Sequence, residues 1–322
     1  HNRIEFGHNY NLPSRQSMYK WFNSHLNLGQ EKPDIEKPHK RLTKKELTVW
    51  DKDNPMPSGG EDFEIGLLSY LTKDVTKKII NKPEVARKGW EVVLGLDSER
   101  SKDVEWELTV KNQQDEYIEM CGLINSRTSK ESIPTLFLYP KNSWNKRVVI
   151  WLTGSGKSGL YKKGINSPEL KDEVLHLLSQ GTAVCGIDLF MQGEFLKDSK
   201  PVEVTRTVAN RREAAAYTHG YNYSLFVQRV RDILTTIKMI ESDHHEANHI
   251  DLVGLKGAGH WAAAANFMSD NLNRVAIETG GFEFINVNTI RHPDFLPGAA
   301  KYGDIKSLIS LAKTKPWVVD DK

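Results

Sequence analysis

Five short, almost uninterrupted apolar segments in the second half of the chain constrain its fold more than any other feature. They are RVVIWLTG (147–154), TAVCGIDLF (182–190), HIDLVGL (249–255), RVAIETG (274–280) and PWVV (316–319). Segments with helical periodicity lie between and around them, at 168–180, 222–241, 258–270 and 304–313. Strands that are apolar on both faces and joined by crossover helices indicate a parallel sheet covered by helices on both sides.

The segment before these strands has a different pattern. A helix is predicted over Glu61–Ile80, and strands near Val104–Lys111, Tyr117–Asn125 and Pro134–Tyr139. The alternation in VEWELTV is typical of a half-exposed antiparallel strand. An antiparallel start followed by a mostly parallel sheet with helices on both faces is the order of the α/β-hydrolase fold. This is the α/β fold class that we predict.

The N-terminal segment is predicted to be organised separately. Residues 1–29 contain a short predicted strand (Arg3–Phe6) and an amphipathic helix that begins at the N-cap Ser14 and stops at Gly29. Residues 30–45 are charged and contain prolines, which indicates a linker. A short strand is predicted within LTVWDKDNPMPSGG (47–60). The predicted division is therefore 1–29, 30–45 and 46–322.

Charge and cysteine content exclude several classes of partner. The 44 basic and 42 acidic residues leave a net charge of +2, so nothing favours nucleic acid or an anionic membrane. No apolar run approaches the roughly 20 residues of a bilayer span. Two cysteines are too few for a disulfide framework or a thiolate metal site, and we expect no metal and no cofactor. Because the chain begins with His1, we interpret it as a processed product or a fragment.

The stretch GLKGAG (254–259) has the shape of the sharp strand-to-helix turn on which many enzymes place a nucleophile. Gly254 and Ala258 flank its apex, where there is no room for larger side chains. The apex residue is Lys256, an amine that cannot replace serine in acyl transfer. We therefore interpret Lys256 as a degenerate nucleophile position. The alternative is a lysine that forms a Schiff base with a carbonyl substrate.

The stretch WLTGSGKSG (151–159) resembles a phosphate-binding loop but departs from it. The motif needs a glycine where Trp151 stands, and a helix that begins at the lysine. Here GLYKKGINSP follows instead. We interpret Gly154 and Ser155 as a candidate oxyanion loop, in which a backbone N–H would face the reacting carbonyl. The alternative is an ordinary glycine turn.

Three histidines are candidate site residues. His8 lies between the predicted strand and helix of the N-terminal segment, the place of a hydrolase triad histidine, although it is also compatible with an ordinary loop. His219 and His260 are candidate pocket residues near the mouth of the predicted sheet. The histidines in SDHHEANH (242–249) indicate a solvated loop rather than a metal site.

Several stretches resemble one protein family. FGHNYNLPSRQSMYKWFNSHL resembles the C-terminal His-and-helix segment of acetylxylan-esterase-like (dienelactone-hydrolase-related) α/β-hydrolases. Consecutive segments of that family resemble GIDLFMQGEF, YTHGYNYSLFVQRVRDILTTI, IDLVGLKGAGHWAAAAN and FLPGAAKYGDIKSLISLAKTKPWVV. Some members carry two hydrolase units in tandem, the second with a degraded nucleophile turn, and this chain resembles the junction and second unit of such a pair.

The resemblance implies a function for the complete protein. It implies hydrolysis of carboxylic esters, such as acetyl groups on plant polysaccharide, with His8 as the general base of a preceding unit. Lys256 falls on the second unit's nucleophile position, which implies that this unit lacks its own serine. Such esterases are usually exported, so a periplasmic or extracellular location is expected. The expected partners are an ester or carbohydrate substrate and a preceding unit or a second copy.

Two alternatives remain open. If residues 1–29 pack beside the strand at 316–319, the chain is one permuted hydrolase unit, and that strand is not left as an exposed apolar edge. Alternatively, the unit with the degenerate turn is a non-catalytic scaffold, dimerisation or glycan-binding module. An open cleft near Lys256 lined by Tyr, Trp and His would favour retained ligand binding, whereas a filled pocket would favour a scaffold.

Overall fold

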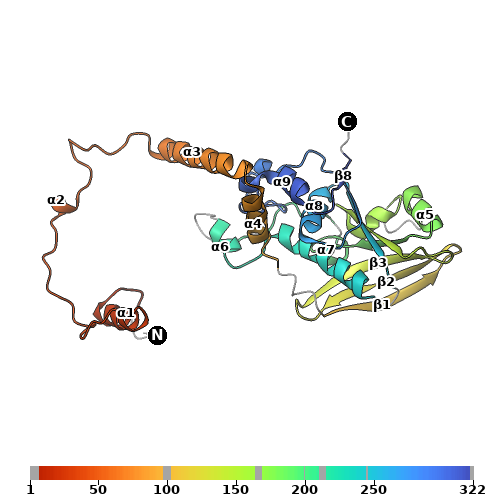
Figure 1. The fold of residues 1–322 in the computed structure, drawn as a ribbon, viewed down its shortest axis with the longest axis horizontal. Helices are drawn as coiled ribbons and strands as arrows, with labels where there is room; N and C mark the ends of the chain where they lie inside the picture. The colour runs from red at the N-terminus through yellow and green to blue at the C-terminus, as the bar shows by residue number, and fades with distance from the viewer. Residues whose placement is uncertain are drawn as a thin grey trace. The chain divides into compact units, whose positions relative to one another are not determined.

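The computed structural model describes residues 7–96, 103–163, 169–198, 200–209, 215–243 and 246–319 (Figure 1). The chain divides into two compact units, residues 1–65 and residues 66–322. Helix α3 (Gly60–Ile80) begins in the first unit and ends in the second. It confirms the helix predicted over Glu61–Ile80. The two units are described in turn.

The first unit contains helix α1 (Leu12–His25) and one turn of helix, α2 (Lys44–Leu47). The N-cap of α1 is Asn11, whose side chain accepts the backbone N–H of Ser14, so the prediction of Ser14 as N-cap was wrong by one turn. No side chain of α1 is buried. The predicted strand within 47–60 was also wrong, because residues 48–59 contain no strand. The predicted strand at 3–6 lies outside the described residues.

Helix α4 (Pro83–Leu94) was not predicted, and it joins α3 to the core of the second unit. Its first turn carries Pro83, and it ends at Gly95 in the left-handed conformation, which is a common stop signal. Trp90 is fully buried, and its indole N–H donates to the carbonyl of Tyr302 at 3.2 Å. Tertiary packing of this one face therefore stabilises α4.

The described strands of the second unit form one sheet with the order β1-β2-β3-β5-β4-β6-β7-β8. β1 to β3 are antiparallel to one another and β3 is antiparallel to β5, whereas β5, β4, β6, β7 and β8 run parallel. This arrangement confirms the predicted antiparallel start and parallel continuation. The strands are β1 (Val104–Gln113), β2 (Tyr117–Ser126), β3 (Glu131–Pro140), β4 (Arg147–Thr153), β5 (Ala183–Ile187), β6 (His249–Leu255), β7 (Arg274–Ile277) and β8 (Trp317–Val318).

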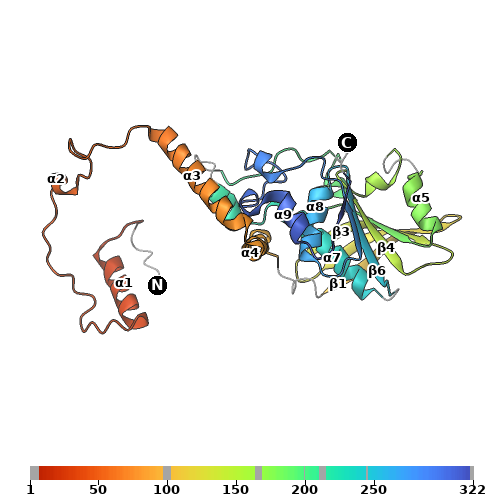
Figure 2. The same cartoon turned by 45° about the horizontal axis from the view of Figure 1, so that its top comes forward.

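Helices cover both faces of this sheet (Figures 1 and 2). α7 (Leu225–Ser242), α8 (Gly259–Met268) and α9 (Asp304–Leu311) lie on one side together with α4, and α5 (Asp172–Ser179) lies on the other. A further short helix, α6 (Ala215–His219), precedes α7. None of the described helices is long and apolar enough to span a membrane.

Side chains that alternate along β4 contribute to two separate cores. Val148, Ile150 and Leu152 join the cluster on the side of α7 and α8. Val149 and Trp151 join the cluster on the side of α5. Both sets are at least nine-tenths buried, which is why the strand is apolar at every position.

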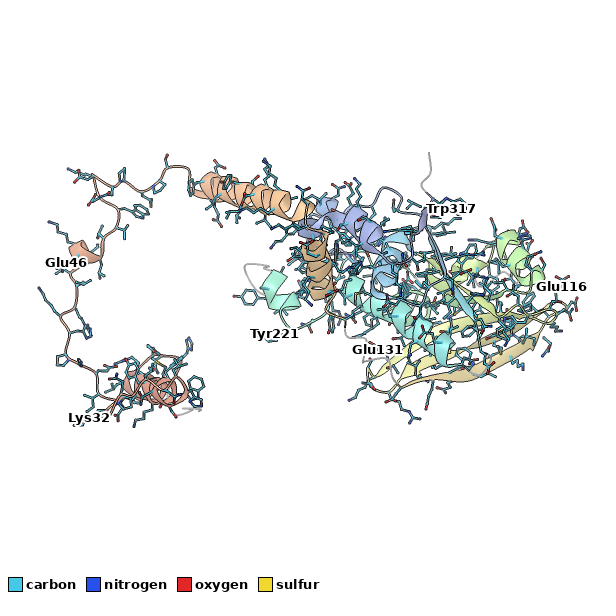
Figure 3. The ribbon with its side chains drawn as sticks, in the orientation of Figure 1. Lys32, Glu46, Glu116, Glu131, Tyr221 and Trp317 are labelled. Atoms are coloured by element: carbon cyan, nitrogen blue, oxygen red, sulfur yellow. The ribbon has the colours of Figure 1, made fainter. Side chains whose placement is uncertain are left out.

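Among the strands that the structure describes, β8 lies at the edge of the sheet and pairs with β7 alone. Its Trp317 side chain is 74% exposed and projects from the molecule (Figure 3). The prediction of a strand at 316–319 is therefore confirmed within one residue at each end. An edge strand with an exposed aromatic side chain can pair or pack further.

Candidate functional site

The turn between β6 and α8 has the tight geometry that its glycines predict. Lys256 and Gly257 both adopt left-handed backbone conformations, with φ of 49° and 87°. A Cβ atom on Gly254 would lie 2.5 Å from the Cβ of Ala262, so that only glycine fits at this position. Lysine in the left-handed region costs on the order of 1–2 kcal/mol, which the surrounding packing must offset. The structure thus places Lys256 at the apex of a strained strand-to-helix turn.

Hydrogen bonds to two neighbouring strand ends hold this apex in place. The backbone N–H of Lys256 donates to the Glu278 carboxylate at 2.7 Å, just beyond β7. The backbone N–H of Gly154, just beyond β4, donates to the carbonyl oxygen of Lys256 at 3.0 Å. A Cβ on Gly154 would meet that same oxygen at 2.7 Å, so the close approach requires glycine. The two strand ends therefore clamp the turn from both sides.

The candidate oxyanion loop lies next to the turn, but its first N–H has a partner. Because a backbone N–H donates one hydrogen bond, Gly154 in this conformation has no donor left for an oxyanion. The Ser155 side chain is exposed, and its hydroxyl lies 3.0 Å from the hydroxyl of Thr153. No described histidine is hydrogen-bonded to either serine of the loop, Ser155 or Ser158.

The lysine of the GSGKSG stretch belongs to a buried ion pair. Lys157 and Asp188 are 3% and 2% exposed, and their charged atoms lie 2.8 Å apart. The Lys157 ammonium also contacts the more exposed Glu194 carboxylate. The backbone N–H groups of Lys157 and Glu194 donate to Asp188 at 2.9 and 3.0 Å. This lysine therefore joins the loop after β4 to the loop after β5, which explains the motif without phosphate.

Sequence reasoning missed Asp188 and Glu194 as partners of this lysine. The available signal was an acidic residue directly after an apolar strand, in GIDLF, beside a glycine loop that follows the neighbouring strand. A Cβ on Gly156 would lie 2.2 Å from the Asp188 carboxylate, so the glycine pattern reflects the close approach of that side chain.

A cleft of about 320 Å³ opens beside Lys256. It lies at the carboxyl ends of β4 and β6, and its other wall is the loop before α5 and the first turn of α5. In the sheet, β4 lies between β5, the next strand along the chain, and β6. Ligands of open α/β sheets bind at such topological switch points. Its charged and aromatic lining includes Trp151, Lys162, Lys171, Asp172, Glu173 and Lys256.

His260 is buried at the start of α8 and pairs with an aspartate. Its Nε2 lies 3.1 Å from Oδ1 of Asp294, which also accepts the indole N–H of Trp261 at 2.7 Å. Burial alone would raise the pKa of Asp294, but the adjacent His260 imidazole, the Trp261 indole N–H and the Arg229 guanidinium hold that pKa below its ordinary value. The imidazole stacks on Phe282 with ring centroids 4.2 Å apart. His260 is thus packed among aromatic rings rather than in the cleft beside Lys256.

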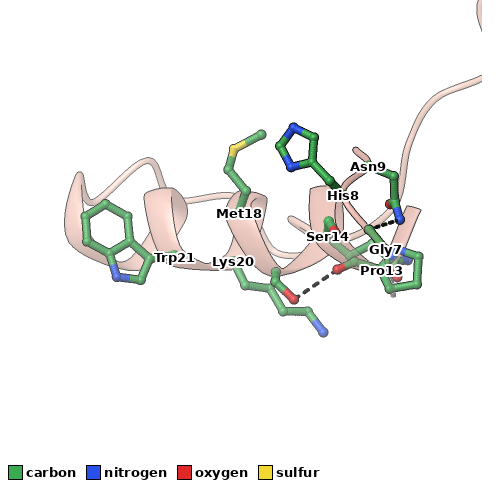
Figure 4. A pocket seen from close by; sticks show the side chains of 10 residues that line it. Gly7, His8, Asn9, Pro13, Ser14, Met18, Lys20 and Trp21 are labelled. Atoms are coloured by element: carbon green, nitrogen blue, oxygen red, sulfur yellow. Dashed lines mark hydrogen bonds between the residues drawn. The ribbon is translucent and has the colours of Figure 1, made fainter. Parts of the chain in front are cut away.

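The other two histidines lie in separate environments. His219 is partly buried against Phe295, with ring centroids 5.4 Å apart, and burial lowers its pKa. His8 belongs to the first unit, where it lines an open hollow along α1 with Met18 and Trp21 (Figure 4). His244 and His245 lie outside the described residues. Within the described ranges, no group of three His, Cys, Asp or Glu side chains could hold a metal ion.

No protein-family model and no curated protein matches this sequence. Among solved structures, a candidate acetyl xylan esterase from Bacteroides fragilis NCTC 9343 aligns with a TM-score of 0.52 and 14% identity, over 84% of this chain and 77% of that chain. Acetyl xylan esterase 1 from Thermoanaerobacterium sp. JW/SL YS485 aligns with a TM-score of 0.49 and 17% identity, over 73% and 78%. The acetyl xylan esterase from Paenibacillus sp. R4 aligns at 0.48 and 14%, over 72% and 77%.

Two of these solved structures are acetyl xylan esterases, the Bacteroides protein is a candidate one, and they have the α/β-hydrolase fold. At 14% identity, the likeness to the Bacteroides protein shows the fold. Together with the strand order and the crossover helices, it confirms the predicted class, an α/β-hydrolase fold with an antiparallel start.

Proposed function

We propose that this chain is a unit of an acetylxylan-esterase-like α/β-hydrolase whose own nucleophile turn does not hydrolyse esters. The observation that carries the proposal is Lys256, which occupies the apex of a correctly shaped turn with φ of 49°. A serine acyl-enzyme is an ester that water can cleave, whereas an acylated lysine is an amide that is far more stable. A lysine at the apex therefore ends the catalytic cycle after one acyl transfer at most.

The environment of the apex supports the same proposal. The Gly154 N–H is hydrogen-bonded to the Lys256 carbonyl, so one candidate oxyanion donor is already engaged. His260, only four residues beyond the apex, is paired with Asp294 inside the core instead of serving as a base for a nucleophile. A unit whose Gly154 N–H is engaged, and whose turn has no histidine base among the described residues, is weakened in two contributions on which acyl transfer depends.

For the complete protein, we assign ester hydrolysis to a preceding hydrolase unit. On the resemblance of residues 6–26, His8 is the general base of that unit, and the substrate is an ester such as an acetylated plant polysaccharide. Residues 1–29, the linker 30–45 and the unit 46–322 are the parts of this arrangement. An exported location follows from the same resemblance.

The second candidate is a non-catalytic module that retains ligand binding. The specific observation in its favour is the open cleft of about 320 Å³ next to Lys256, with Trp151 in its wall. A pure scaffold needs no such opening, so retained binding is favoured over a filled and purely structural core.

The test is covalent labelling with a fluorophosphonate probe, combined with hydrolysis of p-nitrophenyl acetate. We expect no labelled residue by mass spectrometry and only background hydrolysis, both unchanged in Lys256→Ala. A known serine esterase run in parallel shows that the probe is active. Labelling of Ser155, with hydrolysis that Ser155→Ala abolishes and Lys256→Ala does not, would overturn the proposal.

A further inference from the structure

Two lysines line the cleft at the switch point between β4 and β6. Lys256 extends from the apex of the turn, and Lys171 is the residue directly before α5. Among the residues that the structure describes, neither side chain forms an ion pair with a carboxylate. Two lysine charges that share one cleft repel each other, which is unfavourable for the protein alone.

The nearby acidic groups are largely committed elsewhere. Lys162, the third lysine of the cleft, is 2.5 Å from Glu169 and 3.0 Å from Asp172. Glu278 accepts the backbone N–H of Lys256. Glu173 lines the cleft and is exposed, so its charge acts on the cleft through solvent.

The electrostatics of Lys171 reflect this imbalance. Burial lowers the pKa of its ammonium group, and the positive charge of Lys256 lowers it further, while Glu173 acts in the opposite direction. An anion between the two ammonium groups would reverse the second of these effects, because an opposite charge favours the charged form of lysine.

We propose that this cleft binds an organic carboxylate between the ammonium groups of Lys171 and Lys256. The proposal rests on the proposed function, in which Lys256 is not a nucleophile, and it assigns that lysine a binding role. A volume of about 320 Å³ lies at the lower end of the range of small-ligand sites. The Trp151 side chain supplies an apolar wall, which suits the carbon skeleton of a small acid or an acidic sugar.

The test is calorimetric titration of the full chain with sodium glucuronate, sodium acetate and glucose at pH 7 and constant ionic strength. We expect saturable binding of at least one carboxylate and none of glucose, with weaker binding at higher salt. Lys171→Met and Lys256→Met should each weaken binding about tenfold or more, because each removes one charge-assisted contact. Lys163→Met, an exposed lysine outside the cleft lining, is the control with the same charge change and should alter binding less than twofold.

The two carboxylates separate the sources of the ligand. Preference for glucuronate identifies an acidic sugar, and equal binding of acetate identifies the carboxylate alone. No saturable binding of either salt, or equal loss in Lys163→Met and the two cleft variants, would overturn the site. That result would leave the proposed function standing, because the fluorophosphonate labelling tests the nucleophile and not the cleft.

Discussion

The buried pair of Lys157 and Asp188 gives the sharpest prediction. Replacing Lys157 with methionine keeps the unbranched apolar part of the side chain and removes its charge, which leaves the Asp188 carboxylate buried without a cation. Breaking one side of a buried ion pair costs about 3–5 kcal/mol. Asp188 retains two backbone N–H donors at 2.9 and 3.0 Å, so we expect a cost near 3 kcal/mol, at the lower end of this range.

The matched control is the second carboxylate that contacts Lys157. The Glu194 side chain is 59% exposed, so Glu194→Gln should cost less than about 1 kcal/mol, because water replaces a solvent-exposed partner. The double variant Lys157→Met/Asp188→Asn should be more stable than the sum of its single variants predicts, since it leaves no uncompensated charge. Urea denaturation followed by circular dichroism measures the free energies of unfolding of the parent, the three single variants Lys157→Met, Asp188→Asn and Glu194→Gln, and the double variant.

The reasoning would be refuted by either of two results. One is a cost of Lys157→Met below about 1 kcal/mol, the range of an exposed pair. The other is a cost of Glu194→Gln that equals it. Either result would mean that the ion pair between Lys157 and Asp188 does not contribute to the stability of the folded protein as a buried pair would.

Burial raises the pKa of Asp232 to about 8 from an ordinary value of 3.8. Between these two pH values the folded protein keeps a proton on Asp232 that the unfolded chain releases. The contribution of Asp232 to the free energy of unfolding therefore falls as pH rises from about 4 to about 8. Asp232→Asn, whose amide oxygen can still accept the Phe190 N–H, should gain stability relative to the parent across that window in urea denaturation; a constant difference would contradict this. Gly254→Val should lower the free energy of unfolding by about 1–3 kcal/mol because its side chain overlaps the backbone and Ala262. The control is Gly66→Ala in α3, where an added Cβ would have no heavy atom within 4 Å, and it should be neutral or stabilising by up to about 1 kcal/mol. An equal loss of unfolding free energy in Gly254→Val and Gly66→Ala would point to a general effect of replacing glycine. Lys256→Ser should leave p-nitrophenyl acetate hydrolysis at background, because a serine at the apex has no described base; a clear gain of turnover would contradict this.

The sequence alone predicted the elements that depend on local pattern. The strand at 249–255 has the predicted bounds, and the strands at 104, 117, 147 and 274 begin where they were predicted. Errors occurred where a pattern was weak or where packing decided the outcome. Asn11 rather than Ser14 caps α1, because both residue types can cap and the choice depends on where the first turn closes. Helix α4 was missed because Trp90 and Leu94 reveal their role only against the rest of the core.

Part of the candidate site was also visible in the sequence. The glycines around Lys256 predicted a tight turn with that residue at its apex, since a missing Cβ is a property of the residue itself. The identity of the apex residue already argued against acyl transfer. The roles of His8, His219 and His260 could not be read in the same way, because a histidine's function depends on which groups surround it.

What the tertiary structure decided is which distant residues meet. Lys157 pairs with Asp188 and the Gly154 N–H contacts the Lys256 carbonyl because β4 lies between β5 and β6, an order that no local pattern specifies. The same strand order brings Lys171 and Lys256 to one cleft. Periodicity and glycine positions arise from interactions within a few residues and can be read along the chain. Ion pairs and clefts arise from side chains that only the folded sheet brings together.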